Sequence, residues 1–296
     1  MPAIGRLLVA GCGDLGTRVG LLAASRGATV FGVKREPSGL PEPIVGIRGD
    51  LALGAFEVPS DLDAVVLSVA PNRARDDASD RVRLYERTYL ESARGLLRAL
   101  RAAGSTPRRL VFTSSTSVYG EDGGEDVDEG TPAVPREATG RVLLATEELL
   151  RASGFATTAL RCAGIYGPGR TRLVEQVLNG DANYGIAPPR TTNRIHVDDA
   201  AGAVVHVLEM DEPDDLYVVV DEEPAPEGEV LTWLARRLGA EPPRALKGPS
   251  PHGAGKRCSS AKLRASGFVL AYPSFREGYE QVIATLGDGP FAARGR

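Results

Sequence analysis

One glycine-rich turn near the start of the chain restricts the possible folds more than any other feature. The stretch LLVAGCGDLG runs from a short apolar segment into an amphipathic helical pattern and places Gly11, Gly13 and Gly16 in the spacing G-x-G-x-x-G. A turn of this kind between a strand and a helix is typical of a dinucleotide-binding unit. Gly11 permits the tight turn, Gly13 lets a pyrophosphate approach the backbone, and Gly16 lets the helix pack on the strand. We therefore expect a dinucleotide site here, with a simple strand–helix turn as the alternative.

Two groups of residues are predicted to bind the phosphates of that cofactor. The backbone N–H groups of Asp14 and Leu15 face the pyrophosphate at the start of the first helix. NAD-binding proteins place an Asp or Glu at the end of the second strand, but the second strand here, TVFGVKRE, ends in Lys34 and Arg35. Because a guanidinium suits a 2′-phosphate, we expect NADPH to bind in preference to NADH. A chance pair of surface cations is the alternative.

Other cofactor contacts are expected where later strands end, because the carboxyl ends of parallel strands meet at one edge of the sheet. After a third short strand at 44–48, Asp50 is predicted to meet the adenine amino group. The remaining predicted contacts are Leu51, Val69, Ala70, Cys162 and Ala163.

Short β-rich apolar runs alternate with helical patterns along the first part of the chain. The expected strands are 6–10, 29–33, 44–48, 64–69, 109–113 and 157–161, and the longer helices are 84–103 and 139–152. The strands are nearly all apolar, as strands buried on both faces are. This alternation predicts an α/β fold, a Rossmann-type doubly wound parallel sheet with helices on both faces.

The regular alternation weakens after about residue 170, which predicts a second, smaller part. We expect residues 1–170 to form an NADP-binding Rossmann domain. A helix at 198–208 and a strand at 216–220 are expected to return to it, so that 194–221 belongs largely with it. Segments 171–193 and 222–296 carry much Pro and Gly and are expected to form a C-terminal substrate lobe. The acidic stretch EDGGEDVDEGTP, 121–132, is predicted to be an exposed loop without a metal.

Charge and composition argue against several function classes. The 296-residue chain has a net charge of -4, which gives no reason to expect nucleic acid or an anionic membrane as a partner. Its apolar runs are far shorter than the roughly 18 residues of a membrane span. The three cysteines, Cys12, Cys162 and Cys258, form no metal-ligand or disulfide pattern. The start of the chain shows no leader pattern, so we expect a cytoplasmic protein.

Five segments together resemble the extended short-chain dehydrogenase/reductase family, the group of NAD(P)-dependent epimerases and dehydratases. They are RLLVAGCGDLG at 6–16, TSSTSVYG at 113–120, LRCAGIYGPGR at 160–170, RIHVDDAAGAVVHVLE at 194–209 and KRCSSAKLRASGFVLAYPSFREGYEQ at 256–281. The resemblance covers nearly the whole chain. It implies a Rossmann-type domain followed by a small substrate lobe.

Active members of that family carry a Ser or Thr with a Tyr-x-x-x-Lys pair, and this chain departs from that pattern. Alignment places Ser115 at the Ser/Thr position. The helix reads TGRVL where YGRSK is expected, so Thr139 replaces the Tyr and Leu143 replaces the Lys. Gly140 and Arg141 match their family neighbours, which supports the register. The chain therefore resembles an atypical branch that lacks both the catalytic acid and the cation that lowers its pKa. On the same helix, Glu147 and Glu148 are predicted to lie on a polar side.

The absence of the Tyr-x-x-x-Lys pair restricts the reactions that the protein is expected to catalyse. Positioned proton transfer is typically worth 10²–10⁴-fold, whereas hydride transfer depends on how the nicotinamide is held. We expect an NADPH-dependent ketoreductase of secondary metabolism, such as antibiotic biosynthesis, with Ser115 polarising the carbonyl. A hydroxyaryl ketone of the aromatic polyketide type carries a phenol that can supply the proton itself. The side chains predicted to line the substrate are Ser114, Tyr119, Tyr89 and Thr139.

Several alternatives remain open from the sequence. Tyr119 or His196 is a less favoured proton source, and Tyr89 has core packing as its competing role. The whole chain has two alternative functions: a non-catalytic NADP(H)-binding sensor or regulatory protein, and a nucleotide-sugar epimerase/dehydratase. The latter needs the base that is missing. A monomer or a homodimer is expected.

Overall fold

The computed structural model describes residues 4–71, 78–248, 250 and 253–286. Contacts divide the chain into two compact units. The first, here called the Rossmann unit, comprises Met1–Gly120, Pro132–Arg161 and Ala201–Tyr217. The second, here called the C-terminal unit, comprises Glu121–Thr131, Cys162–Ala200 and Val218–Arg296.

A seven-stranded sheet in the order β12-β7-β5-β4-β1-β2-β3 organises the first half of the fold. Its strands are β1 Arg6–Ala10, β2 Thr29–Lys34, β3 Val45–Arg48, β4 Ala64–Leu67, β5 Arg109–Ser115, β7 Thr157–Cys162 and β12 Leu216–Val219. Each of β1 and β4 pairs in parallel with its neighbours on both sides. The chain reverses its direction across the sheet between β1 and β4. Ligands of such sheets bind at that switch point.

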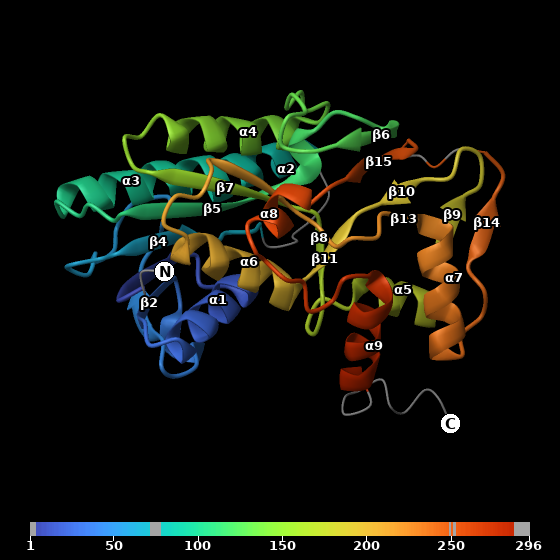
Figure 1. The fold of residues 1–296 in the computed structure, drawn as a ribbon, viewed down its shortest axis with the longest axis horizontal. Helices are drawn as coiled ribbons and strands as arrows, with labels where there is room; N and C mark the ends of the chain where they lie inside the picture. Colours follow the sequence, from blue (N-terminus) through green and yellow to red (C-terminus); the bar gives the residue numbers. More distant parts are fainter. Residues whose placement is uncertain (1–3, 72–77, 249, 251–252, 287–296) are drawn as a thin grey trace. The chain divides into compact units, whose positions relative to one another are not determined.

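Helices cover both faces of this sheet, with α2, α3 and α4 on one face and α1 and α6 on the other (Figure 1). Their bounds are α1 Asp14–Ser25, α2 Ala78–Tyr85, α3 Ser92–Ala102, α4 Ala138–Arg151 and α6 Val197–Glu209. A π-helical segment, η2 Glu86–Glu91, joins α2 to α3, and short 3₁₀ turns lie at η1 Pro37–Gly39 and η3 Thr116–Val118. The predicted α/β doubly wound fold is confirmed. The predicted helix 84–103 is a continuous run with a π-helical insertion.

The sheet forms because its central strands β1 and β4 are apolar at successive positions rather than at alternate ones. All four residues of β4 are buried, and so are Leu7, Leu8, Val9 and Ala10 of β1. Burial on both faces is what a parallel sheet between two helical layers requires.

The C-terminal unit has its own sheets and core. A four-stranded sheet runs β13-β10-β15-β6, and two strand pairs, β11-β8 and β14-β9, stand beside it in the described chain. The strands are β6 Gly123–Val127, β8 Gly164–Tyr166, β9 Asn183–Gly185, β10 Thr191–Thr192, β11 Arg194–His196, β13 Ala225–Pro226, β14 Arg244–Leu246 and β15 Gly255–Cys258. The helices are α5 Arg172–Leu178, α7 Glu227–Leu238, α8 Ala261–Ala265 and α9 Phe275–Leu286. Side chains of α5, α7 and α9 form one buried cluster that includes Val174, Leu234 and Phe275.

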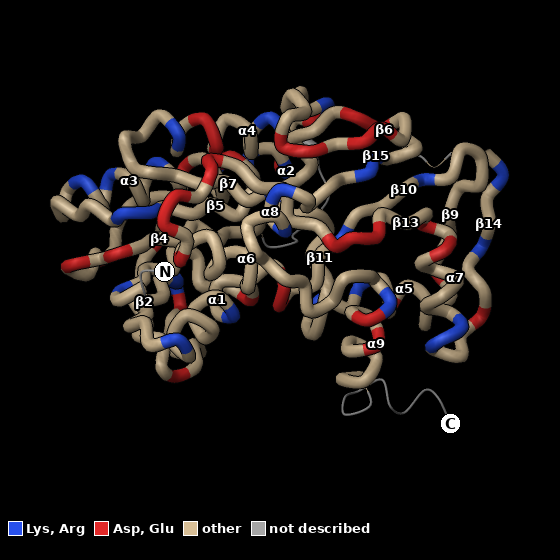
Figure 2. The backbone as a smooth tube through the Cα atoms, viewed as in Figure 1, with Lys and Arg blue, Asp and Glu red and all other residues tan. Residues whose placement is uncertain are grey.

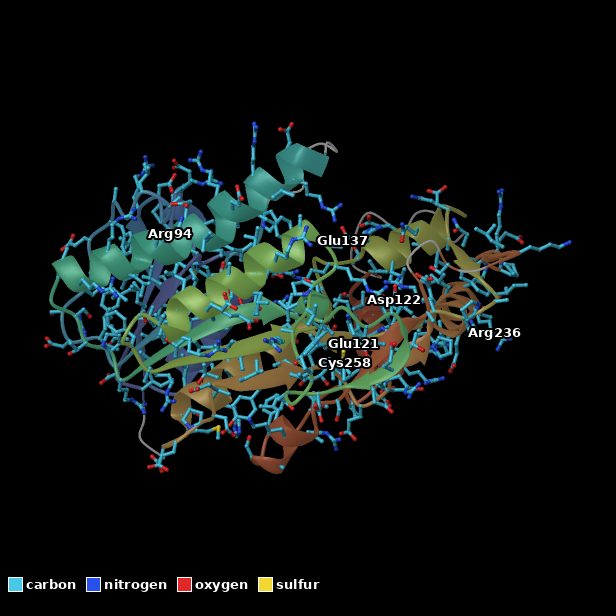
Figure 3. All side chains as sticks on the ribbon, turned by 90° about the horizontal axis from the view of Figure 1, so that it is seen from above. Arg94, Glu121, Asp122, Glu137, Arg236 and Cys258 are labelled. Carbon is cyan, nitrogen blue, oxygen red and sulfur yellow. The ribbon has the colours of Figure 1, made fainter. Side chains whose placement is uncertain are left out.

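The acidic stretch 121–132 is not simply an exposed loop, and that prediction was wrong. Its residues Gly123–Val127 form β6, which pairs in parallel with β15. The Asp126 carboxylate accepts two hydrogen bonds from Arg257 at 2.8 and 2.9 Å, and Figure 2 shows acidic β6 beside the basic strand β15. Figure 3 places Glu121, Asp122 and Cys258 close together at this sheet. The Asp126 carboxylate therefore has a cationic partner far along the chain.

Within the described ranges, no helix is both long and apolar enough to cross a membrane.

Candidate active site

The glycine turn has the geometry that a bound pyrophosphate requires. Gly11 has a φ of +89°, and a Cβ there would lie 2.5 Å from the Ser68 carbonyl oxygen. A Cβ on Gly16 would lie 2.7 Å from the Gly11 carbonyl oxygen, so only glycine lets α1 start this close to β1. By contrast, apart from the adjacent residues, the described part of the chain places no heavy atom within 4 Å of the Cβ position of Gly13. The outer side of the turn is therefore open where the phosphates are expected.

The first turn of α1 presents backbone N–H groups at the same place. The Thr17 N–H donates to the Gly13 carbonyl at 2.8 Å and makes the first bond of the helix. The N–H groups of Asp14, Leu15 and Gly16 precede it and have no acceptor within the helix. Gly13 provides no side-chain cap. These residues fit a dinucleotide pyrophosphate, because the donors and the helix dipole both favour an anion.

Lys34 is the last residue of β2 and Arg35 follows it, and both are exposed. Among the described residues, neither forms an ion pair, so their charges are available to an anion. The Lys34 ammonium is close enough to favour the thiolate of Cys12, yet burial outweighs it and raises the pKa of that thiol. Cys12 therefore stays a neutral packing residue beneath the turn.

The other predicted cofactor residues of the Rossmann unit lie at the same edge of the sheet. Asp50 accepts a hydrogen bond from the Ala52 N–H at 3.0 Å and pairs with Arg87 at 3.4 Å, so its carboxylate already has partners. Leu51 is buried, and Val69 borders the Cβ position of Gly11. Ala70 is exposed. Their contacts with a cofactor stay predictions.

Cys162 and Ala163 belong to the C-terminal unit by contact. Both are buried, and the Ala163 N–H donates to the Val219 carbonyl at 3.1 Å. Burial raises the pKa of the Cys162 thiol to about 12, so it stays protonated at neutral pH. Their predicted cofactor contact also stays a prediction.

The carboxyl end of β5 presents Ser115 to the site. Its side chain is half-buried, and its Oγ accepts a hydrogen bond from the Ser117 N–H at 3.1 Å. Because that bond uses a lone pair of the oxygen, the hydroxyl proton is left to donate to another acceptor. Ser115 can therefore polarise a carbonyl oxygen.

Ser114, one residue earlier, faces the interior instead. It is buried, and its hydroxyl donates to Glu147 Oε1 of α4 at 2.5 Å. Arg161 holds the same carboxylate with both Nε and Nη2, the latter at 2.7 Å. The Ser114 hydroxyl is thus engaged within the Rossmann unit, and its predicted substrate role stays a prediction.

Glu147 is only 2% exposed, so its predicted place on a polar side of the helix was wrong, whereas Glu148 is exposed. Burial disfavours the charge of Arg161, but the bonds to Glu147 and the neighbouring Tyr119 outweigh it and raise the pKa of the guanidinium. The Arg161 guanidinium lies 4.7 Å above the ring centre of buried Tyr119. Tyr119 is held by packing and a cation–π contact, and its substrate role stays a prediction.

α4 packs against the end of β5 through a glycine. A Cβ on Gly140 would lie 2.6 Å from the Ser117 carbonyl oxygen, so glycine brings the start of this helix against the turn that follows Ser115. Thr139 is half-buried beside it, and Leu143 is 2% exposed. The helix that should carry Tyr and Lys is therefore in place, with a weak hydroxyl and a buried aliphatic side chain at those positions.

Tyr89 lies in the π-helical segment η2, a type of irregularity frequent at functional sites. Its ring packs on Tyr85 at 5.3 Å and edge-on against Phe112 of β5 at 6.3 Å. This contact favours the packing role, and its role toward substrate stays a prediction. His196, the other proposed acid, is fully buried in the C-terminal unit and stacks on Tyr272 at 3.9 Å.

Three comparisons place this geometry among known proteins. Residues 7–219 match the model of the NAD dependent epimerase/dehydratase family. The chain belongs to this family. It shares the NAD(P)-binding fold of the family's oxidoreductases.

Among curated relatives, protein YeeZ of Escherichia coli is 27% identical over 90% of this chain and 96% of its own. The 3-diazoavenalumate denitrifying reductase of a Streptomyces species is 34% identical over 81% of this chain and 84% of its own. A solved protein from Methylobacillus flagellatus, described as a candidate NAD-dependent epimerase/dehydratase, is 30% identical with a TM-score of 0.77, covering 96% of this chain and 99% of its own. A UDP-glucose 4-epimerase gives a TM-score of 0.81 at 20% identity over 97% and 98% of the two chains, which shows the fold alone.

Proposed function

We propose that this protein is an NADPH-dependent reductase whose acceptor needs no proton from the protein. One observation carries the proposal: the phosphate turn is complete, while α4 offers Thr139 and buried Leu143 where the family resemblance expects an acid and a cation. Such a site keeps the means to bind a hydride donor and lacks the means to protonate an alkoxide.

The favoured acceptor is a ketone beside a phenol hydroxyl. NADPH, when bound, supplies the hydride. Ser115 donates its hydroxyl proton as a hydrogen bond to the carbonyl oxygen, where negative charge develops. The neighbouring phenol then transfers its proton to that oxygen and leaves a phenolate, which water reprotonates after release. The chain's residues polarise and orient, and the substrate is the acid.

A second acceptor class is favoured by one specific relative. The 3-diazoavenalumate denitrifying reductase is named for a reduction of a diazo compound with loss of nitrogen. For an aryl diazonium group, one hydride gives the arene and dinitrogen, so the reaction balances with no proton at all. This chemistry suits the same site because it, too, requires no proton from the protein.

The preference for NADPH rests on Lys34 and Arg35. Both are exposed at the end of β2, and neither has an ion-pair partner in the described part of the chain. A 2′-phosphate would satisfy both charges, whereas the ribose hydroxyls of NADH would leave them unpaired.

The test follows NADPH absorbance with three acceptor sets: ketones with a neighbouring phenol, the same ketones as methyl ethers, and aryl diazonium salts. Turnover confined to the free phenols supports the ketoreductase, and turnover of the diazonium salts supports the second class. Turnover of the methyl ethers would contradict proton supply by the substrate. If nothing turns over despite tight NADPH binding, the proposal gives way to the sensor function.

Ser115→Ala is expected to lower kcat/KM for the ketone roughly tenfold to a hundredfold, as removal of one hydrogen bond to developing charge does. Ser117→Ala is the matched control, because the bond to Ser115 comes from the backbone N–H of residue 117 and survives the change. Equal activity of the two variants would remove Ser115 from the mechanism.

A further inference from the structure

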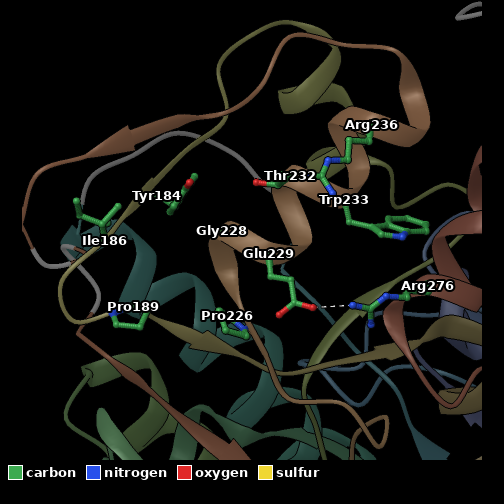
Figure 4. A pocket seen from close by; sticks show the side chains of 11 residues that line it. Tyr184, Ile186, Pro189, Pro226, Gly228, Glu229, Thr232, Trp233, Arg236 and Arg276 are labelled. Carbon is green, nitrogen blue, oxygen red and sulfur yellow. Dashed lines mark hydrogen bonds and ion pairs between the residues drawn. The ribbon is translucent and has the colours of Figure 1, made fainter.

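We infer that the C-terminal unit contains a binding site for a small aromatic carboxylate, in a pocket beside α7 (Figure 4). The pocket has a volume of about 490 Å³, which lies in the range of small-molecule sites. This inference is independent of the reaction proposed for the Rossmann unit.

One face of α7 forms the floor of this pocket. Glu229, Thr232, Trp233 and Arg236 all line it, and their spacing of three, four and seven residues places them on one side of a helix. The opposite face of α7 is anchored in the core by Val230, Leu231, Leu234 and Ala235. Because the helix is fixed from behind, the pocket-facing side chains share a rigid support.

The pocket also has an apolar lining, which includes two aromatic rings held in place. Tyr184 rests directly on the backbone of Gly228, where a Cβ would lie 2.4 Å from the ring. Trp233 is fixed edge-on against Phe275, with ring centres 5.6 Å apart. The remaining apolar lining comes from Ile186, Pro189 and Pro226. Rigid rings and prolines suit a planar aromatic ligand, which packs on them at little cost in ordering.

One cation of the pocket is left to bind an anion. Arg276 is bonded to Glu223 and, at 2.6 Å, to Glu229, so two carboxylates already engage this cation. Arg236 also lines the pocket, is exposed, and lies at the surface in Figure 3. Within the described chain it has no ion-pair partner. A guanidinium beside aromatic walls binds a carboxylate through two parallel hydrogen bonds.

Trp233 makes the site directly measurable, because it is the only tryptophan of the chain. The full-length protein is titrated with 3-phenylpropanoate, with the neutral 3-phenylpropanamide and with phenyl phosphate. Indole fluorescence and calorimetry are both recorded, with and without saturating NADPH. We expect saturable binding of the carboxylate and roughly tenfold weaker binding of the amide, which cannot form the charge-assisted bonds.

Two neighbouring arginines provide a matched pair of variants. Arg236→Gln is expected to weaken carboxylate binding roughly tenfold, as loss of a charge-assisted bond does, and to leave amide binding unchanged. Arg237→Gln is the control, because Arg237 pairs with Glu280 at 2.6 Å and does not line the pocket. Its affinity should match that of the unmodified protein.

Three results would overturn the inference: no saturable signal with any probe, equal affinity for acid and amide, or equal affinity of the two arginine variants. Binding of phenyl phosphate as tight as that of the carboxylate would also overturn it, and would assign the pocket to aryl phosphates. Because these readouts are binding signals, they fail or succeed separately from any measurement of NADPH oxidation.

Discussion

Glu147 and Glu148 are adjacent residues of α4 with opposite environments. Glu148 is exposed, whereas Glu147 bonds Ser114 and Arg161 in the interior of the Rossmann unit. A buried pair of this kind contributes little compared with an apolar pair of the same shape, but removing one charge leaves the other unpaired in a medium of low dielectric.

Glu147→Gln is therefore expected to lower the free energy of unfolding by roughly 3–5 kcal/mol, because Arg161 keeps its charge without a counterion. Glu148→Gln should change it by less than about 0.5 kcal/mol, as exposed substitutions do. Urea denaturation of both variants measures the difference. Similar midpoints would mean that the Arg161 charge is compensated elsewhere.

Asp221 predicts a pH dependence within the C-terminal unit. It is 2% exposed, and burial raises the pKa of its carboxyl to about 7, although nearby Arg194 opposes the shift. The folded state then binds this proton more tightly than the unfolded state, whose Asp pKa is about 3.9. The contribution of Asp221 to stability is therefore present below about pH 4 and falls as the pH rises toward 7.

Asp221→Asn should remove this decline. The melting temperature of the variant, relative to that of the unmodified protein, should therefore rise between pH 5 and pH 8. Glu222→Gln is the control, because Glu222 is its exposed neighbour, paired with Arg264 at 3.3 Å. If the melting temperatures of Asp221→Asn and the unmodified protein change with pH in parallel, Asp221 does not titrate in this range.

At the scale of elements, the contact between α4 and the end of β5 decides whether the site forms. Gly140→Ala places a Cβ 2.6 Å from the Ser117 carbonyl oxygen, so the helix start must move away from Ser115. We expect a loss of about 1–3 kcal/mol, the usual cost of overpacking, and reduced turnover. Helix propensity alone would stabilise a Gly→Ala variant by about 1 kcal/mol, and Ala145→Gly, the reverse change in α4, measures that contribution. Full activity of Gly140→Ala would show that the close approach is not required.

Elements built on local pattern were predictable from the sequence, and contacts across long separations were not. The apolar runs predict β1, β2 and β4 within two residues, because burial of a strand on both faces shows in its own residues. Glu147 was misplaced because its partners, Ser114 and Arg161, lie 33 and 14 residues away. β6 was missed because its charges pair with Arg257, 131 residues later. The face of α7 that lines the pocket lies in a region whose Pro and Gly content hides the helical pattern.

At the scale of the whole molecule, the preference for one cofactor should be measurable as a difference in thermal stability. A ligand that binds only the folded state stabilises it by RT ln(1 + [L]/Kd), about 2.7 kcal/mol at one hundred times Kd. NADPH should therefore raise the melting temperature by several degrees, and NADH at the same concentration should raise it less. Lys34→Ala with Arg35→Ala should abolish the difference, while Arg151→Ala, at an exposed position of α4, should keep it. Equal shifts in the unmodified protein would contradict the preference for NADPH.

The two units are interleaved along the chain, which crosses from one to the other at residues 120, 131, 161, 200 and 217. On the ribosome, the last segment of the Rossmann unit, Ala201–Tyr217, is made only after two of the three segments of the C-terminal unit have emerged. The Rossmann unit therefore cannot be complete before part of the C-terminal unit has been synthesised, and no single cut in the gene yields either unit whole. Evolution can exchange loops in such a protein, but it cannot swap one half for another by a single recombination.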